Sequence, residues 1–276
     1  MLMTPAALLS HIHAVPAIPK VVQQLIETFD APEVNVSRVS RLVNTDPMIA
    51  AKVLRLANSA YYRRARAVAS IDDAVVFLGL DALRMLVVGA GFAGVLPVPT
   101  ALGRALFWRY CLHTAVCAKF FAEGAGEDAQ AAFTAGLLHA IGEPLMLMAL
   151  EEPLKGIEAN ARFYDHERAA CERACVGFSF SDLGAALADQ WRFPPAIVEA
   201  IRAAPAPLEV EPFPKLAACV YLGAHFAAGL ERHEHPDVSL STLDLRVADG
   251  LGLDYGRIAR MPPVAKLAEG LEELVA

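Results

Sequence analysis

Residues 45–88 read TDPMIAAKVLRLANSAYYRRARAVASIDDAVVFLGLDALRMLVV and carry the clearest helix boundaries in this chain. Asp46-Pro47 has the form of an N-cap followed by proline at the first helical position. Apolar residues then recur at helical spacing and indicate one buried face: Ile49, Val53, Leu56 and Ala57. The pattern predicts a helix that begins near residue 47 and gives way at Asn58-Ser59.

Two more helix starts follow within the same stretch. Ser70, with Asp73 three residues later, has the form of a capping box. Gly79 predicts the end of that helix, and Asp81 is interpreted as the cap of the next one. A short aromatic and basic loop separates the first two helices. Strand signals are almost absent, so the stretch predicts an all-α fold.

The remaining sequence extends this helical pattern in both directions. Thr100 is interpreted as the cap of a long apolar helix, and Asp128 as the start of another. Residues 233–241 are interpreted as a polar loop, before a tail of short helices. We expect residues 1–99 to form a small N-terminal helical subdomain, and residues 100–276 a larger helical subdomain with a C-terminal helical tail.

Composition narrows the class of protein. The chain has 276 residues, is 55% hydrophobic and carries a formal net charge of −7, so it can bury a large core and nucleic acid is not an expected partner. Its five cysteines show no zinc spacing, and the first residues lack a secretory signal, which favours reduced thiols in the cytoplasm. The uncharged run 85–103 contains two prolines and is predicted to be a buried helix ending near Leu96, not a membrane span.

Several segments resemble the HDOD domain, a bacterial relative of the HD-domain metal-dependent phosphohydrolases. The similar segments are IPKVVQQLIETF, DPMIAAKVLRLANSAYY, SIDDAVVFLGLDALRMLV, FWRYCLHTAVCAKFFA, AFTAGLLHAIGEPLML and GFSFSDLGAALADQWRFPPAIVEAIR, within residues 18–221. The resemblance implies an all-α, HD-like helical bundle with a smaller N-terminal helical subdomain. It also implies a role in bacterial signalling or regulation.

The resemblance further indicates where an HD metal site would lie. Such a site gathers His and Asp side chains from several helices around one or two divalent ions. Here the central His-Asp pair reads His139-Ala140, and the first His of the family corresponds to Tyr110. The G-x-x-H position is Phe180, and a later paired His is replaced by Ala203-Ala204. One His of the set remains, so we expect no metal and no other cofactor.

Other histidines and the tryptophans have simpler interpretations. His113 lies one turn, about 5 Å, along the helix from Tyr110 and is interpreted as a helix-face residue. His139 is interpreted as a core or pocket histidine that bonds to the backbone. Trp108 and Trp191 are expected in the core. The glycines of VVGAGFAGV lack a preceding strand, so they favour close helix packing over a nucleotide loop.

These observations lead to a non-catalytic signalling or regulatory module that acts through protein–protein interaction or senses a small ligand. The candidate degenerate pocket comprises Tyr110, His139 and Phe180. The candidate interaction surface comprises Asn58, Tyr61, Tyr62, Arg63 and Arg64. We expect a signalling protein as partner, and neither a membrane nor nucleic acid.

Two alternatives stay open. The first is a metal-dependent phosphohydrolase acting on a nucleotide or cyclic dinucleotide, with a site rearranged around His139 and His113. The second is a receptor that binds a nucleotide second messenger without hydrolysing it, which requires arginine or aromatic side chains around a pocket.

Overall fold

The computed structural model describes residues 4–12, 17–28, 36–62, 67–158 and 161–275, and within these ranges it contains helices and no strand. This confirms the predicted all-α class. The α-helices are α1 (Pro5–His11), α2 (Lys20–Ile26), α3 (Val36–Val43), α4 (Pro47–Ala57), α5 (Ile71–Leu78), α6 (Leu80–Val95), α7 (Arg104–Ala125), α8 (Ala129–Leu138), α9 (Gly142–Ala149), α10 (Glu151–Glu158), α11 (Arg168–Val176), α12 (Phe180–Gln190), α13 (Pro195–Ala203), α14 (Lys215–Glu231), α15 (Pro236–Ser241), α16 (Leu245–Gly250), α17 (Tyr255–Ala259) and α18 (Val264–Ala268). The 3₁₀ helices are η1 (Ala60–Tyr62), η2 (Pro207–Glu209) and η3 (Glu272–Leu274).

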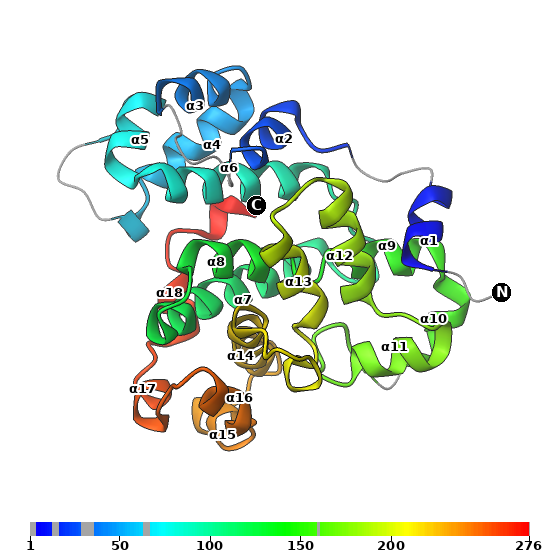
Figure 1. Ribbon diagram of the computed structural model, residues 1–276. Helices are drawn as coiled ribbons and strands as arrows, with labels where there is room; N and C mark the ends of the chain where they lie inside the picture. The colour runs from blue at the N-terminus through cyan, green and yellow to red at the C-terminus, as the bar shows by residue number, and fades with distance from the viewer. Residues whose placement is uncertain (1–3, 13–16, 29–35, 63–66, 159–160, 276) are drawn as a thin grey trace.

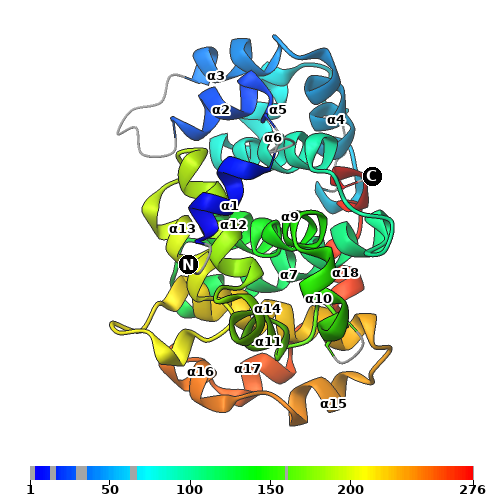
Figure 2. The same cartoon turned by 90° about the vertical axis from the view of Figure 1, so that its right-hand side faces the viewer.

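The helices are stacked in three levels, which Figures 1 and 2 show from two sides. Helices α2–α6 lie together at one end. The long helix α7 runs through the middle, where it packs against α8 and α14. The short helices α15–α17 lie at the opposite end, and the C-terminal segment then returns toward α6.

Capping side chains explain why the helices of the opening stretch begin where they do. The Asp46 carboxylate accepts hydrogen bonds from the amides of Met48 and Ile49 at 3.0 and 3.1 Å. The Ser70 hydroxyl accepts one from the amide of Asp73 at 3.0 Å. Both predicted helix starts are therefore confirmed, and both satisfy amide groups that a helix leaves without intrahelical partners.

Three predicted boundaries were wrong. Gly79, with φ of +80°, ends α5 and directly precedes α6, so Asp81 falls in the first turn of α6. Turns between Pro99 and Gly103 delay the long helix, which starts after Gly103 and not after Thr100. Residues 236–241 form α15, because Pro236 occupies its first position and the His235 ring accepts a hydrogen bond from Asp237 N.

Helix α6 joins the N-terminal helices to the middle level, because it packs against α2, α4 and α5 and also against α8. It is buried on nearly all sides, as predicted for the apolar run that ends near Leu96. Its glycines allow close packing, since a Cβ added at Gly91 would lie 2.3 Å from Val22 Cγ2. Phe92 of the same helix contacts the Trp191 ring, with ring centres 4.7 Å apart. The subdomain boundary near residue 99 stays a prediction.

Residues 129–149 are the one described segment whose length and hydropathy would suit a membrane span. Of its most apolar window, 89% is buried inside the protein. The segment comprises α8 and α9 with the turn between them, and both helices pack against other helices of the bundle. Core packing accounts for its composition.

Candidate functional site

The three residues predicted to form the degenerate pocket do meet in space. Tyr110 comes from the middle of α7, His139 from the end of α8 and Phe180 from the start of α12. They border a cavity of about 30 Å³, here called the His139 cavity. Its other lining residues are Phe163, Tyr164, Asp165, His166, Ala169, Ala204, Pro205, Tyr221 and Ala224. A space of this size holds a water molecule or two, and not a nucleotide.

Aromatic rings occupy most of the space around His139. The Tyr110 ring centre lies 5.2 Å from that of His139, 5.5 Å from Phe163 and 6.0 Å from Tyr164. Burial raises the pKa of the Tyr110 phenol, which therefore stays neutral. The position of the first family ligand thus presents an uncharged ring in an aromatic cluster.

His139 has the backbone contact predicted for it. Its side chain is buried, and Nδ1 lies 2.7 Å from the Gly136 carbonyl oxygen. A carbonyl can only accept, so Nδ1 carries the proton and Nε2 carries the lone pair. Burial lowers the pKa of His139 to about 4, and the ring is neutral at ordinary pH.

His166 of the cavity lining pairs with a second histidine, His225. No motif in the sequence indicated this pair. His225 Nε2 lies 2.7 Å from the Ser239 carbonyl oxygen, which fixes the proton on that nitrogen. His225 Nδ1 then accepts from His166 Nε2 at 2.9 Å. Burial, followed by the neighbouring His225, lowers the pKa of His166 to about 4. The two residues are 59 positions apart in sequence, so only the fold brings them together.

The carboxylate at this cavity is already engaged. One oxygen of Asp165 lies 3.3 Å from Arg232 Nη1, and the other accepts from the Arg162 amide at 2.8 Å. Arg232 also binds Glu234 at 2.6 Å. In the described part of the chain, no three His, Cys, Asp or Glu side chains are grouped so as to hold a metal ion.

His113 lies elsewhere, on the face of α7 that packs toward Glu231 of α14. It is 7% exposed and its Nδ1 lies 3.5 Å from Glu231 Oε1. Arg109 binds the same carboxylate through two nitrogens, at 2.9 and 2.5 Å. Burial alone would raise the pKa of Glu231, but the bonds from Arg109 and His113 outweigh it and lower the pKa to about 2. His113 does not line the His139 cavity.

A buried ion cluster fixes the segment that fills the cavity. Arg168 donates from Nε to Glu172 at 2.6 Å, from Nη2 to Glu143, and from Nη1 to the Ala161 carbonyl at 3.0 Å. All three charged side chains are at most 1% exposed. Glu172 also accepts from the Phe180 amide at 2.7 Å. The cluster therefore ties α9, α11 and α12 to the chain just before Phe163 and Tyr164.

Two described residues of the predicted interaction surface, Asn58 and Tyr62, make contacts within the protein. The Asn58 side-chain amide donates to the carbonyls of Leu54 and Val68 at 2.8 and 2.9 Å, and its oxygen accepts from Val68 N at 2.7 Å. Asn58 therefore joins the end of α4 to Val68. Tyr62 is half-buried and packs against Phe77, with ring centres 6.3 Å apart. Arg63 and Arg64 lie outside the described residues.

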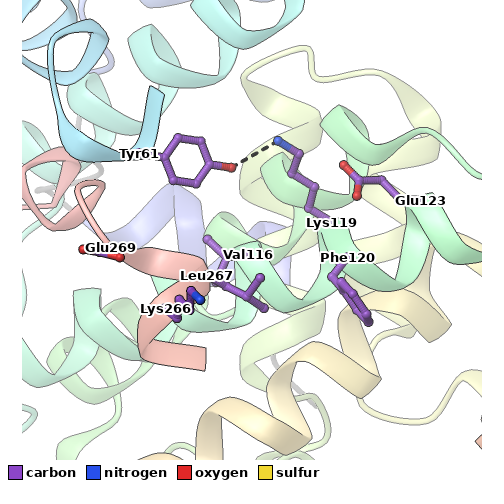
Figure 3. Close-up of a pocket in the computed structure, with 8 residues that line it drawn as sticks. All are labelled: Tyr61, Val116, Lys119, Phe120, Glu123, Lys266, Leu267 and Glu269. Atoms are coloured by element: carbon purple, nitrogen blue, oxygen red, sulfur yellow. Dashed lines mark hydrogen bonds between the residues drawn. The ribbon is translucent and has the colours of Figure 1, made fainter. Parts of the chain in front are cut away.

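Tyr61 borders a pocket of about 230 Å³ between η1, α7 and α18, shown in Figure 3. Lys119 points toward Tyr61 and donates from Nζ to the phenol oxygen at 3.3 Å. Lys266 adds a second positive charge, while Glu123 and Glu269 add two negative charges. The pocket therefore has no net charge to favour one kind of ligand.

Comparison with known proteins gives a consistent family. The model of the HDOD domain matches residues 15–207. A crystal structure from Shewanella amazonensis SB2B, provisionally named a phosphohydrolase, is 30% identical, with a TM-score of 0.78 and 98% of each chain covered. An HDOD domain protein of unknown function from Geobacter sulfurreducens is 25% identical, with a TM-score of 0.75 and 98% of this chain and 94% of that chain covered.

A curated relative extends beyond the matched region. It is an uncharacterized protein of Treponema pallidum (strain Nichols), 27% identical over 202 residues. The match covers 71% of this chain and 39% of the relative. The chain thus spans well under half the length of that protein.

Proposed function

This chain belongs to the HDOD domain family, and we propose that it serves as a non-catalytic module in bacterial signalling or regulation. The observation that carries the proposal is the filled site. Where the family resemblance locates metal ligands, this chain has Tyr110, Ala140 and Phe180 around His139. Aromatic side chains leave a cavity of about 30 Å³.

The chemistry of the remaining groups supports the same conclusion. Divalent-metal hydrolysis needs several ligands acting together and an open position for water. His139 offers one imidazole nitrogen, and Asp165 is bound to Arg232. A site rearranged around His139 and His113 would need both at one cavity, whereas His113 pairs with Glu231.

We place the module in the cytoplasm and expect it to act on a signalling protein or a small ligand. All five cysteines are free thiols, and burial raises the pKa of Cys219 to about 12. Burial raises the pKa of Cys111 and Cys117 as well, so these thiols are unreactive packing groups. Free thiols of this kind suit a reducing compartment.

Metal analysis of the purified full chain, combined with a hydrolysis screen, tests the proposal. After incubation with Mn²⁺, Fe²⁺ or Mg²⁺ and desalting, we expect far less than one ion per chain. We also expect no turnover of nucleotides, cyclic dinucleotides or a chromogenic phosphodiester. An HD-domain phosphohydrolase that retains its ligands serves as the positive control in the same assay.

One result would reject the non-catalytic assignment. It is stoichiometric metal together with turnover that is abolished in His139→Ala and retained in His235→Ala. His235 is exposed and its ring does not line the His139 cavity, which makes it a matched control.

A further inference from the structure

A larger pocket lies on the other side of the residues that fill the His139 cavity. Phe163 and Tyr164 line both spaces, so this short segment is a wall between them. The second space measures about 320 Å³ and is here called the Arg162 pocket. Its volume is at the lower end of that of small-molecule sites, about 300–1,000 Å³.

The Arg162 pocket has distinct apolar and polar parts. Leu102, just before α7, and Leu106, in its first turn, contribute to the apolar part of the lining, as does Phe163. The buried ion pair of Glu143 and Arg168 forms part of its lining. Apolar walls together with a few fixed polar groups are features of sites for small organic molecules.

Arg162 differs from the other arginines around this region. Arg168 is paired with Glu143 and Glu172, Arg232 with Asp165 and Glu234, and Arg173 with Asp182. Arg162 makes no salt bridge with a carboxylate of the described residues.

The Arg162 guanidinium is nevertheless held in place. It donates from Nη1 to the Tyr164 hydroxyl at 2.6 Å and lies 5.9 Å from the centre of that ring. The Asp165 carboxylate attracts the guanidinium without touching it. The Asp165 oxygens are bound instead to the Arg162 amide and to Arg232. The exposed Arg162 therefore presents an oriented cation at the mouth of the pocket.

We propose that the Arg162 pocket binds a small organic anion: a phosphate or carboxylate held by Arg162, with a flat apolar body between Leu106 and Phe163. Guanidinium pairs with both kinds of anion through two parallel N–H donors, which accounts for the shared chemistry. The volume suits one ring system with its anionic group and is too small for a cyclic dinucleotide. The inference rests on the proposed sensing role and names its site.

Titration calorimetry on the full chain tests the proposal with phenyl phosphate and benzoate as probes. Phenol and inorganic phosphate each supply one half of the expected ligand, and AMP tests whether a mononucleotide fits. We expect phenyl phosphate, benzoate or both to bind at least about tenfold more tightly than either half. The stronger of the two probes distinguishes a phosphate ligand from a carboxylate ligand.

Substitutions then assign the site. Arg162→Ala should weaken binding about tenfold or more, and Arg162→Lys should restore part of it, because lysine keeps the charge but loses the paired donors. Arg173→Ala removes another arginine that does not line the pocket and should leave binding unchanged. Arg162 is exposed and Arg173 is partly exposed, and thermal unfolding should show that both variants are folded.

Three results would overturn the proposal. They are no binding of either probe at about 10 mM, equal binding of inorganic phosphate and phenyl phosphate, or equal losses in Arg162→Ala and Arg173→Ala. These results do not depend on metal content or hydrolysis. A failure of this inference is therefore separate from a failure of the non-catalytic assignment.

Discussion

His139 is a buried histidine that is held by the backbone and by aromatic neighbours. The Gly136 carbonyl accepts a hydrogen bond from Nδ1, and the Tyr110 ring packs beside the imidazole. A buried imidazole is tolerated in this setting because it is neutral. His139 therefore acts as part of the core.

The lowered pKa of His139 predicts a loss of stability in acid. Its folded-state pKa of about 4 lies below the unfolded value of about 6.5, so the unfolded chain takes up the proton first. The contribution is fully present above about pH 6.5 and is lost as the pH falls toward 4, to a limit of about 3 kcal/mol. Urea unfolding between pH 7 and pH 4.5 measures this slope.

A variant measures how much His139 contributes to the change of unfolding free energy with pH. His139→Gln removes the titrating group and keeps a polar side chain, so its stability should fall less steeply with acid than that of the unmodified chain. His235→Gln alters an exposed histidine and should leave the slope unchanged. Identical slopes in all three proteins would contradict the prediction.

Asn58 predicts a second effect at the scale of one side chain. Asn58→Ala removes three hydrogen bonds and leaves the Val68 amide without its acceptor, which should cost about 1–3 kcal/mol. Asn58→Asp keeps that acceptor but loses both donors, so it should fall between alanine and the unmodified chain. Chemical denaturation measures the stability of the three proteins. An alanine variant of unchanged stability would show that the hydrogen bonds of Asn58 do not stabilise the fold.

Helix starts could be predicted from local sequence signals, whereas contacts between residues distant in the sequence could not. The caps at Asp46, Ser70 and Asp128 act within three residues, so each is visible in the sequence. Asn58 was selected for its place in an aromatic and basic loop, whereas its partner Val68 lies ten residues away. Gly79 alone separates α5 from α6, so α6 begins before Asp81, the residue predicted to be its cap.

The crossing of α9 and α12 depends on one position. A Cβ added at Gly142 would lie 2.0 Å from the Phe180 carbonyl oxygen, a backbone atom that cannot rotate away. Gly142→Ala should therefore destabilise the protein by about 1–3 kcal/mol or more through overpacking. Gly156→Ala, on α10 with open space around it, should be neutral or slightly stabilising. Thermal unfolding compares the two, and equal midpoints would refute the role of the crossing.

At the scale of the whole molecule, the C-terminal segment shares a core with α4 and α6. Leu271 and Leu274 are fully buried, and η3 contacts α4 and α6. Gly89 of α6 leaves room for Leu274, whose side chain would lie 2.8 Å from an added Cβ. The family resemblance could predict the central bundle. For the C-terminal tail, the short apolar pattern predicted helices but not their contacts. Its contact with α6 could not be predicted because it joins Gly89 and Leu274, which lie far apart in the sequence.

Leu274 should therefore contribute as much as a central core residue. Leu274→Ala should cost about 2–5 kcal/mol, the range for a buried leucine that leaves a cavity. Leu245→Ala, at a leucine that is 47% exposed, should change stability by roughly 0.5 kcal/mol or less. Urea unfolding followed by far-UV circular dichroism measures both, and a similar small change in the two would refute the shared core.

The return of the chain to α6 sets an order of events during translation. Helices α2–α6 are synthesised well before Leu274, which forms part of their core. Until then the groove beside Gly89 is uncovered, and nascent chains with exposed apolar surface are the ones that aggregate or recruit chaperones. Ribosome-bound chains stalled before residue 270 should thus be far more sensitive to protease in their first hundred residues than released protein.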